Sequence, residues 1–268
     1  MAVAQAPRAH FEPAPKEPSF HVGVMGMYIF LASEVMFFGS LFAVYAYLFA
    51  SHGQWPPPGT KAVEYWPLPT INTAVLLSSG ITCHFGLEAL RHGSRLGKGA
   101  LVAAGALAFF GGADLLFAAI SAVSGLWFEV GLALFGAIIQ GACIAVAFSV
   151  GPFGAPRMTF YGLWIGTILL GVAFEAGQAF EFATAHIKLT TNQFASAFFT
   201  MTGFHGGHVA GGLILLTLVL GRALKGQFDT QHHVGPAAIT LYWHFVDLVW
   251  IFLYGILYFA IGVSASAH

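Results

Sequence analysis

Ionisable side chains inside long apolar segments are the residues of this sequence whose types and spacing could do chemistry. His205 and His208 are three residues apart, as are His244 and Asp247, so each pair can share one face of a helix. Such imidazole and carboxylate groups could ligate haem or copper, or pass protons. Hydrogen bonding between helices is the alternative. It is favoured because the pattern lacks the histidines at both membrane levels that are typical of a di-haem cytochrome.

Acidic residues in similar segments form a second set of candidates. Glu34 lies near the middle of the first apolar segment, and Glu175, Gln178 and Glu181 follow one another at three-residue steps. A charged group in the middle of a bilayer costs several kcal/mol, so each of these residues is a functional candidate. For Glu34, a hydrogen-bonded structural role is favoured over a proton relay, because a relay needs partners at other depths.

The composition decides what kind of protein carries these residues. Of the 268 residues, 57% are hydrophobic and only 8% are charged, and the mean hydropathy is +0.78. Soluble domains carry about 25% charged residues, so a soluble globular domain is excluded. The apolar runs are continuous, which also excludes a porin-type barrel with its alternating strands. A net charge of −1 gives no attraction to nucleic acid, and we expect no such partner.

Seven apolar runs are long enough to cross a bilayer, which needs about 20 residues per helix. We therefore predict an all-α polytopic membrane bundle of seven transmembrane helices. The last run contains no lysine, which excludes a retinal protein with a Schiff base in that helix. The predicted spans are 22–50, 69–91, 99–123, 127–150, 158–184, 194–221 and 237–262.

The basic residues predict the orientation of these helices, because Lys and Arg are enriched in cytoplasmic loops. With the N-terminus inside, eight of the ten fall on the cytoplasmic side and two, Lys61 and Lys188, fall outside. We predict a cytoplasmic tail over 1–21, a single bundle over 22–262 and an outer tail over 263–268. The eight inner residues are Arg8, Lys16, Arg91, Arg95, Lys98, Arg157, Arg222 and Lys225.

Small and aromatic residues predict how the helices pack. Glycines about four residues apart allow close helix approach, and they predict tight packing of the fifth and sixth spans. Trp243, Asp247, Trp250 and Tyr254 share one face of the last span, which is typical of a packing surface or of contact with a second protein. The glycines concerned are Gly162, Gly166, Gly171, Gly203, Gly207 and Gly211.

Several long sequence motifs are more informative about the protein family than the spacing of single residues. GMYIFLASEVMFFGSLF, LPTINTAVLLSSGIT and FEAGQAFEF are followed by SAFFTMTGFHGGHVAGG, RALKGQFDTQHHVG and LYWHFVDLVWIFLYGILY. In these strings and in their order, the sequence resembles subunit III of the haem–copper respiratory oxidases, the cytochrome c oxidase subunit 3 family. The resemblance covers residues 20–92 and 158–262.

The resemblance implies an accessory subunit with no catalytic residue, metal or other cofactor of its own. Haem and copper would lie in partner subunits, with subunit I as the main contact and subunit II and small subunits nearby. The complex would reduce oxygen to water and pump protons in a bacterial-type plasma membrane. The chain would stabilise subunit I, support proton uptake and bind phospholipid.

The resemblance also implies roles for individual residues. Glu34 matches the family's intramembrane glutamate and is the proton-related candidate. The basic loop matches a lipid-facing region, which fits the attraction of inner cations to anionic lipid. The candidates for lipid binding in this loop are Arg222, Lys225, His232 and His233. The candidates for a structural network between helices are His205, His208, Trp243, His244, Asp247, Glu175 and Glu181.

One departure from the family pattern concerns the middle of the chain. The sequence fits a five-helix core over 22–92 and 158–262, with an extra helical hairpin over 99–150 that inherits no role. The strings leave quinol oxidase and nitric oxide reductase open as alternative complexes. The residues alone leave a free-standing proton or solute transporter open as well.

Overall fold

Seven long helices make up the computed structural model, which describes residues 22–57, 60, 66–92, 97–149 and 156–259. All seven are long and apolar enough to cross a membrane, which confirms the predicted fold class. The orientation remains a prediction, and the tails predicted over 1–21 and 263–268 lie outside the described residues. The helices are α1 (Val22–Ser51), α2 (Leu68–His92), α3 (Gly97–Val123), α4 (Trp127–Ser149), α5 (Pro156–Thr184), α6 (Gln193–Leu224) and α7 (Val234–Leu253), followed by the π-helix η2 (Tyr254–Phe259).

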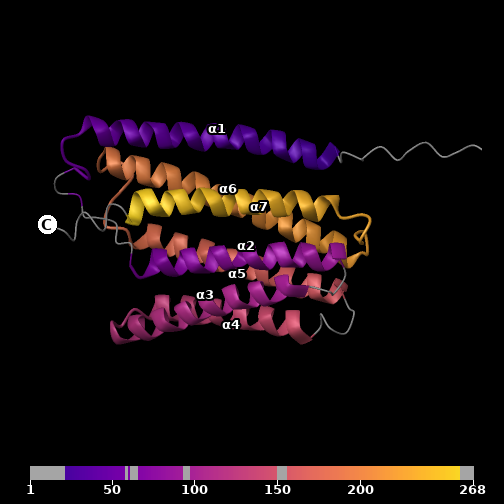
Figure 1. Cartoon of the computed structure of the whole chain (residues 1–268). Coiled ribbons are helices and arrows are strands. Elements are labelled where there is room, and N and C mark those ends of the chain that lie inside the picture. The colour runs from indigo at the N-terminus through magenta and orange to yellow at the C-terminus, as the bar shows by residue number, and fades with distance from the viewer. Residues whose placement is uncertain (1–21, 58–59, 61–65, 93–96, 150–155, 260–268) are drawn as a thin grey trace, which may run out of the picture.

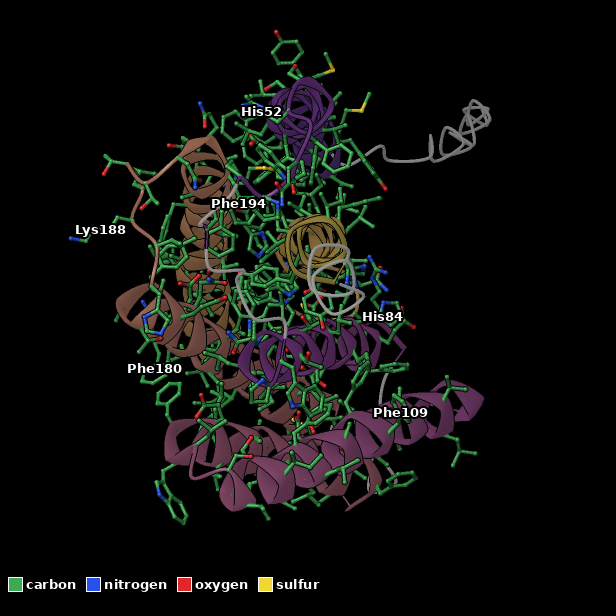
Figure 2. All side chains as sticks on the ribbon, turned by 90° about the vertical axis from the view of Figure 1, so that its left-hand side faces the viewer. His52, His84, Phe109, Phe180, Lys188 and Phe194 are labelled. Carbon is green, nitrogen blue, oxygen red and sulfur yellow. The ribbon has the colours of Figure 1, made fainter. Side chains whose placement is uncertain are left out.

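The helices run side by side, with α1 at one edge and the α3–α4 hairpin at the opposite edge (Figure 1). Viewed along the bundle, His52 after α1 and Phe109 of α3 lie on opposite sides of the molecule (Figure 2). Helices α2 and α5 pair closely in the middle, α4 contacts both of them, α3 contacts α2 and α4, and α1 contacts α7 and α6. Most of α1 faces outward, so few contacts hold it to the bundle.

A row of polar contacts joins α7 and η2 to α2 through the middle of the bundle. The aromatic face predicted on α7 therefore packs inside this chain, against hydroxyl groups spaced along α2. Hydrogen bonds of this kind between membrane helices contribute about 0.6 kcal/mol each on average. The pairs are Tyr254 with Thr70 (2.8 Å), Trp250 with Thr73 (3.0 Å), Trp243 with Ser79 (2.9 Å) and Cys83 with Thr240 (3.5 Å).

The glycines of α5 behave as predicted, whereas of the three predicted on α6 only Gly211 meets a neighbour, with an added methyl group 3.7 Å from the Tyr242 hydroxyl. Added methyl groups at Gly162, Gly166 and Gly171 would collide with side chains of neighbouring helices, so close packing depends on them. At Gly203 and Gly207 an added methyl group would meet nothing within 4 Å, so that part of the prediction is wrong. The spacing showed a face rich in small residues, but it could not show which face of α6 the neighbours cover.

Gly212 is the α6 glycine that packs closely, and the spacing pattern missed it. An added methyl group there would lie 2.7 Å from Cζ3 of Trp243, and one at Gly171 would lie 3.0 Å from Cη2 of the same ring. The indole of Trp243 is fully buried. Helices α5 and α6 therefore each approach the ring of Trp243 closely at a glycine.

The α3–α4 hairpin is held by a reciprocal arrangement of polar and small residues. The side chain of Gln140 lies over Gly111, and that of Asp114 lies over Gly136. The Gln140 amide donates hydrogen bonds to Asp114 Oδ2 at 2.9 Å and to Ser78 Oγ of α2 at 3.0 Å. The hairpin is therefore fastened both to itself and to α2 inside the bundle.

We expect the Asp114→Ala variant to unfold at a lower temperature and its free energy of unfolding to fall by about 1 kcal/mol. The reason is that the buried amide of Gln140 loses Asp114 as a hydrogen-bond acceptor. The Asp114→Asn variant is the control, since its amide oxygen can still accept that hydrogen bond. Thermal unfolding in detergent measures both variants. Equal destabilisation by alanine and asparagine would show that the hydrogen bond does not hold the hairpin.

Candidate functional site

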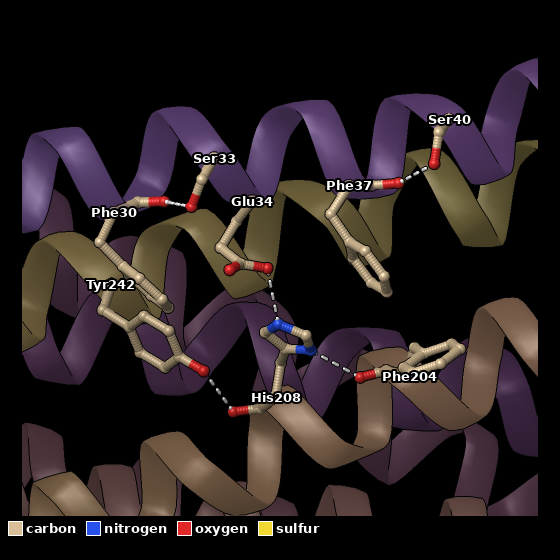
Figure 3. A network of polar contacts seen from close by, with 8 residues as sticks. All are labelled: Phe30, Ser33, Glu34, Phe37, Ser40, Phe204, His208 and Tyr242. Carbon is tan, nitrogen blue, oxygen red and sulfur yellow. Dashed lines mark hydrogen bonds and ion pairs between the residues drawn. The ribbon is translucent and has the colours of Figure 1, made fainter.

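An intramembrane carboxylate and imidazole meet where α1 packs on α6 (Figure 3). His208 Nε2 lies 3.0 Å from Glu34 Oε2, although the two residues are 174 positions apart in the sequence. Both side chains are largely buried, with 16% of Glu34 and 20% of His208 exposed. The structure therefore supplies the partner that the sequence could not assign to Glu34.

The contacts of the His208 ring determine which of its two nitrogens carries a hydrogen. Nδ1 lies 2.7 Å from the carbonyl oxygen of Phe204, and a carbonyl can only accept, so Nδ1 carries a hydrogen. In neutral imidazole Nε2 is then an acceptor, and a neutral Glu34 would donate to it. Transfer of that proton would give a carboxylate paired with an imidazolium. In either form one proton lies between the two residues and the pair has no net charge.

Aromatic side chains enclose this pair. The rings of Phe37 and Phe38 lie 6.1 and 5.0 Å from the His208 ring, measured between centroids. Tyr242 of α7 donates a hydrogen bond to the His208 carbonyl oxygen at 2.8 Å. The site thus joins α1, α6 and α7, and its apolar walls strengthen electrostatic interactions within it.

His205 lies three residues before His208 but faces different neighbours. Its ring stacks on Trp250 at 5.0 Å and meets Phe174 edge-on at 5.8 Å. It is fully buried, and neither ring nitrogen has a hydrogen-bond partner among the described residues. The structure does not bring the two histidines to one site. Within the described residues, no group of three His, Cys, Asp or Glu side chains is arranged to hold a metal ion.

His244 and Asp247 do come together, on the side of α7 that faces α2. Nδ1 of His244 lies 3.6 Å from Oδ2 of Asp247, and the ring of His84 lies 5.9 Å from that of His244. The Asp247 carboxylate lies over Gly80 of α2. His84 is exposed and the His244 side chain is 40% exposed, so two imidazoles reach the outer surface of the bundle.

The two α5 glutamates have separate surroundings. Glu181 Oε2 accepts hydrogen bonds from Gln178 at 2.9 Å and from Tyr258 at 3.1 Å. Glu175 lies toward α6, where an added methyl group at Gly206 would be 3.8 Å from its carboxylate oxygens. Sequence reasoning did not assign Tyr258 to this contact, because nothing in the η2 segment identifies its partner.

The basic residues lie at the junction of α6 and α7. Arg222 belongs to the last turn of α6 and Lys225 is its C-cap, where cations interact favourably with the helix dipole. The Arg222 guanidinium lies 5.3 Å from the centroid of the Phe228 ring and donates to Gln227. His233 is the N-cap residue of α7. The loop between α6 and α7 is therefore shorter than the predicted spans implied.

Asp229 organises this junction and was missed at the sequence level. Its Oδ1 accepts hydrogen bonds from the backbone N–H groups of His232 (2.7 Å) and Gln231 (2.8 Å). These backbone donors, His232 first, hold the pKa of Asp229 below its usual value. An Asp two and three residues before the amides that it caps is a turn signal that the sequence did contain.

A family comparison identifies the chain that carries this site. The model of the family described as "Cytochrome c oxidase subunit III" matches residues 18–149 and 139–261. The chain belongs to the cytochrome c oxidase subunit III family. Membership confirms the resemblance inferred from the sequence strings, and the matched residues also include the α3–α4 hairpin.

Relatives in this subunit III family come from bacteria and from eukaryotes. Cytochrome c oxidase subunit 3 of Thermostichus vulcanus is 33% identical, covering 91% of this chain and 90% of the relative. The Synechocystis protein of the same name is 30% identical, and the match covers 88% of this chain and 74% of that relative. Cytochrome c oxidase subunit 3 of Coturnix japonica is 30% identical, and the match covers 87% of this chain and 67% of that relative.

Proposed function

We propose that this chain is the accessory, non-redox subunit III of a respiratory cytochrome c oxidase in a bacterial-type plasma membrane. The family match over nearly the whole chain carries this proposal. The chain would lie with its N-terminus in the cytoplasm, as the basic residues predict. Subunit I would hold the haem and copper and reduce oxygen, and this chain would stabilise it and support proton uptake.

The Glu34–His208 pair is the candidate for the proton-related role. The two side chains lie 3.0 Å apart beside aromatic rings, and transfer of a proton from one to the other would leave no net charge on the pair in the membrane. The pair also fastens α1 to the bundle, and the structural role favoured from the sequence and the proton role can coexist. Variants of Glu34 that keep the hydrogen bond but cannot exchange a proton distinguish the structural role from the proton role.

The outer face that carries His84 and His244 is the candidate contact with subunit I. Imidazoles exposed in the membrane-spanning part of a bundle are unfavourable against lipid and favourable against hydrogen-bonding groups of another protein. Subunit II and small subunits are further expected partners.

Phospholipid is expected at the junction of α6 and α7. Arg222, Lys225 and His232 are exposed there, while His233 is half-buried. If the N-terminus lies inside, this junction faces the cytoplasmic leaflet, whose anionic headgroups attract cations.

Co-purification tests the proposed function. Tagged chain extracted in mild detergent is expected to bring with it a haem-bearing subunit, and the chain stripped of partners is expected to show no haem absorbance. Stoichiometric haem in the isolated chain would overturn the proposal. So would proton or solute flux in liposomes that contain this chain alone, which a transporter predicts.

A further inference from the structure

Two imidazoles lie side by side on the outer face of the bundle, where α7 packs on α2. The ring centroids of His84 and His244 are 5.9 Å apart, and the ring planes are tilted by 46°. His84 is exposed at the edge of the bundle, and 40% of the His244 side chain is exposed (Figure 2). The two rings are separate from the Glu34–His208 pair, which lies where α1 packs on α6.

The distance between the two rings is close to that of histidines that share a metal ion. Zinc lies about 2.0–2.1 Å from a ligating imidazole nitrogen, and so about 3 Å from the centroid of that ring. Two rings on one tetrahedral ion then have centroids about 5 Å apart. The rings of His84 and His244 would need to approach by about 1 Å, which side-chain rotation allows at exposed positions.

A buried carboxylate stands beside this pair. Asp247 Oδ2 lies 3.6 Å from Nδ1 of His244, and only 7% of Asp247 is exposed. Its other oxygen, Oδ1, is buried and has no hydrogen-bond partner among the described residues. A carboxylate next to one nitrogen of a histidine orients the ring and raises the basicity of the nitrogen that binds the metal. Nε2 of His244 is then the nitrogen available to an ion.

An ion can reach the pair from one end of the bundle. His84 lies about 12 Å from the end of α2 and His244 about 15 Å from the start of α7, and these ends lie together (Figure 1). Glu88 follows His84 by one helical turn toward that end and lies 3.8 Å from Arg91. A carboxylate between the helix end and the imidazoles raises the local concentration of cations along this path.

The donor atoms select the class of ion. Imidazole nitrogen suits Zn²⁺, Cu²⁺ and Ni²⁺, whereas Mg²⁺ and Ca²⁺ prefer oxygen. Among the described residues, no third His, Cys, Asp or Glu side chain completes the ligand set. The ion would therefore keep open positions for water or for a group of the subunit that covers this face.

We propose that His84 and His244 bind one divalent transition-metal ion of the zinc class, and that Asp247 positions His244 for it. The site lies on the face proposed as the contact with subunit I. It does not depend on that contact, because both imidazole ligands belong to this chain.

Zinc binding to the purified assembly that contains the chain tests this proposal. The assembly is stripped with a chelator and dialysed against Zn²⁺, and the zinc gained per chain is counted by mass spectrometry. His84→Ala and His244→Ala are each expected to lose one equivalent, and Asp247→Asn is expected to weaken binding by about tenfold. His186→Ala, which removes an exposed imidazole beyond the end of α5, is the matched control and is expected to keep the full zinc content.

X-ray absorption at the zinc edge identifies the ligands of the zinc gained. Two imidazoles are expected in the unmodified assembly and one in any zinc that His84→Ala retains. Unchanged zinc content in both histidine variants, bound zinc without imidazole ligands or no zinc uptake at all would overturn the proposal. If His244→Ala fails to assemble, His84→Ala decides, because its ring is exposed. Co-purification of haem tests the proposed function separately, so the two can fail independently.

Discussion

The Glu34→Ala variant is expected to assemble into the oxidase complex but to lose catalytic lifetime. Its own loss of stability is expected to be about 2 kcal/mol, because His208 Nε2 is left buried without its charged or hydrogen-bonded partner. The loss of stability is expected mainly in the attachment of α1, because this helix has few other contacts with the bundle. Unfolding in detergent and the number of turnovers before inactivation measure the two losses.

The Glu34→Gln variant separates the proton role from the structural role. Its side-chain amide can still donate a hydrogen bond to His208 Nε2, but it cannot exchange a proton. We expect stability close to that of the unmodified protein, with slower proton uptake by the complex. A double-mutant cycle with His208→Ala is expected to show a coupling energy of about 1–2 kcal/mol. If Glu34→Gln leaves proton uptake and lifetime unchanged, Glu34 is structural only.

Replacing Gly212 with alanine is expected to destabilise the bundle by about 3 kcal/mol. The added methyl group would lie 2.7 Å from Trp243 and 3.0 Å from Tyr242, and Gly171 of α5 already approaches the same buried indole. Overpacking a filled core typically costs about 1–3 kcal/mol, and this ring cannot move without losing its hydrogen bond to Ser79. Thermal unfolding of the purified protein measures the effect.

Gly207→Ala is the matched control, because it makes the same change on the same helix where no atom lies within 4 Å. It is expected to be neutral or slightly stabilising, since alanine favours helix more than glycine does. The Trp243→Phe replacement is expected to relieve part of the Gly212→Ala defect, so that the two losses do not add. Equal stability of the two glycine variants would contradict the packing described for Trp243.

The helices could be predicted from the sequence because each depends on local apolar length. The limits of α2 and α3 agree closely with prediction, and residues 124–126 alone separate the two helices of the hairpin. The junction of α6 and α7 was predicted less well, because Arg222 and Val234 lie in helical turns beyond the apolar runs. Helix ends depend on capping and tertiary contacts as well as on hydropathy.

The pairing within the site could not be predicted, because it depends on which helices become neighbours. Glu34 and His208 were both singled out, yet nothing in their spacing indicates that α1 packs on α6. His205 and His208 were expected to share a face, but their three-residue offset lets α7 cover one and α1 contact the other. Spacing identifies which residues are unusual, while packing decides what each of them meets.

Oxygen reduction and proton translocation, measured together on the purified complex in vesicles, test whether this chain supports the oxidase as its subunit III. The complex is compared with and without this chain. We expect oxygen reduction to start in both preparations. Loss of the chain is expected to slow proton uptake and shorten catalytic lifetime, and adding the chain back is expected to restore them. Identical proton translocation and lifetime in the two preparations would contradict this role of the chain.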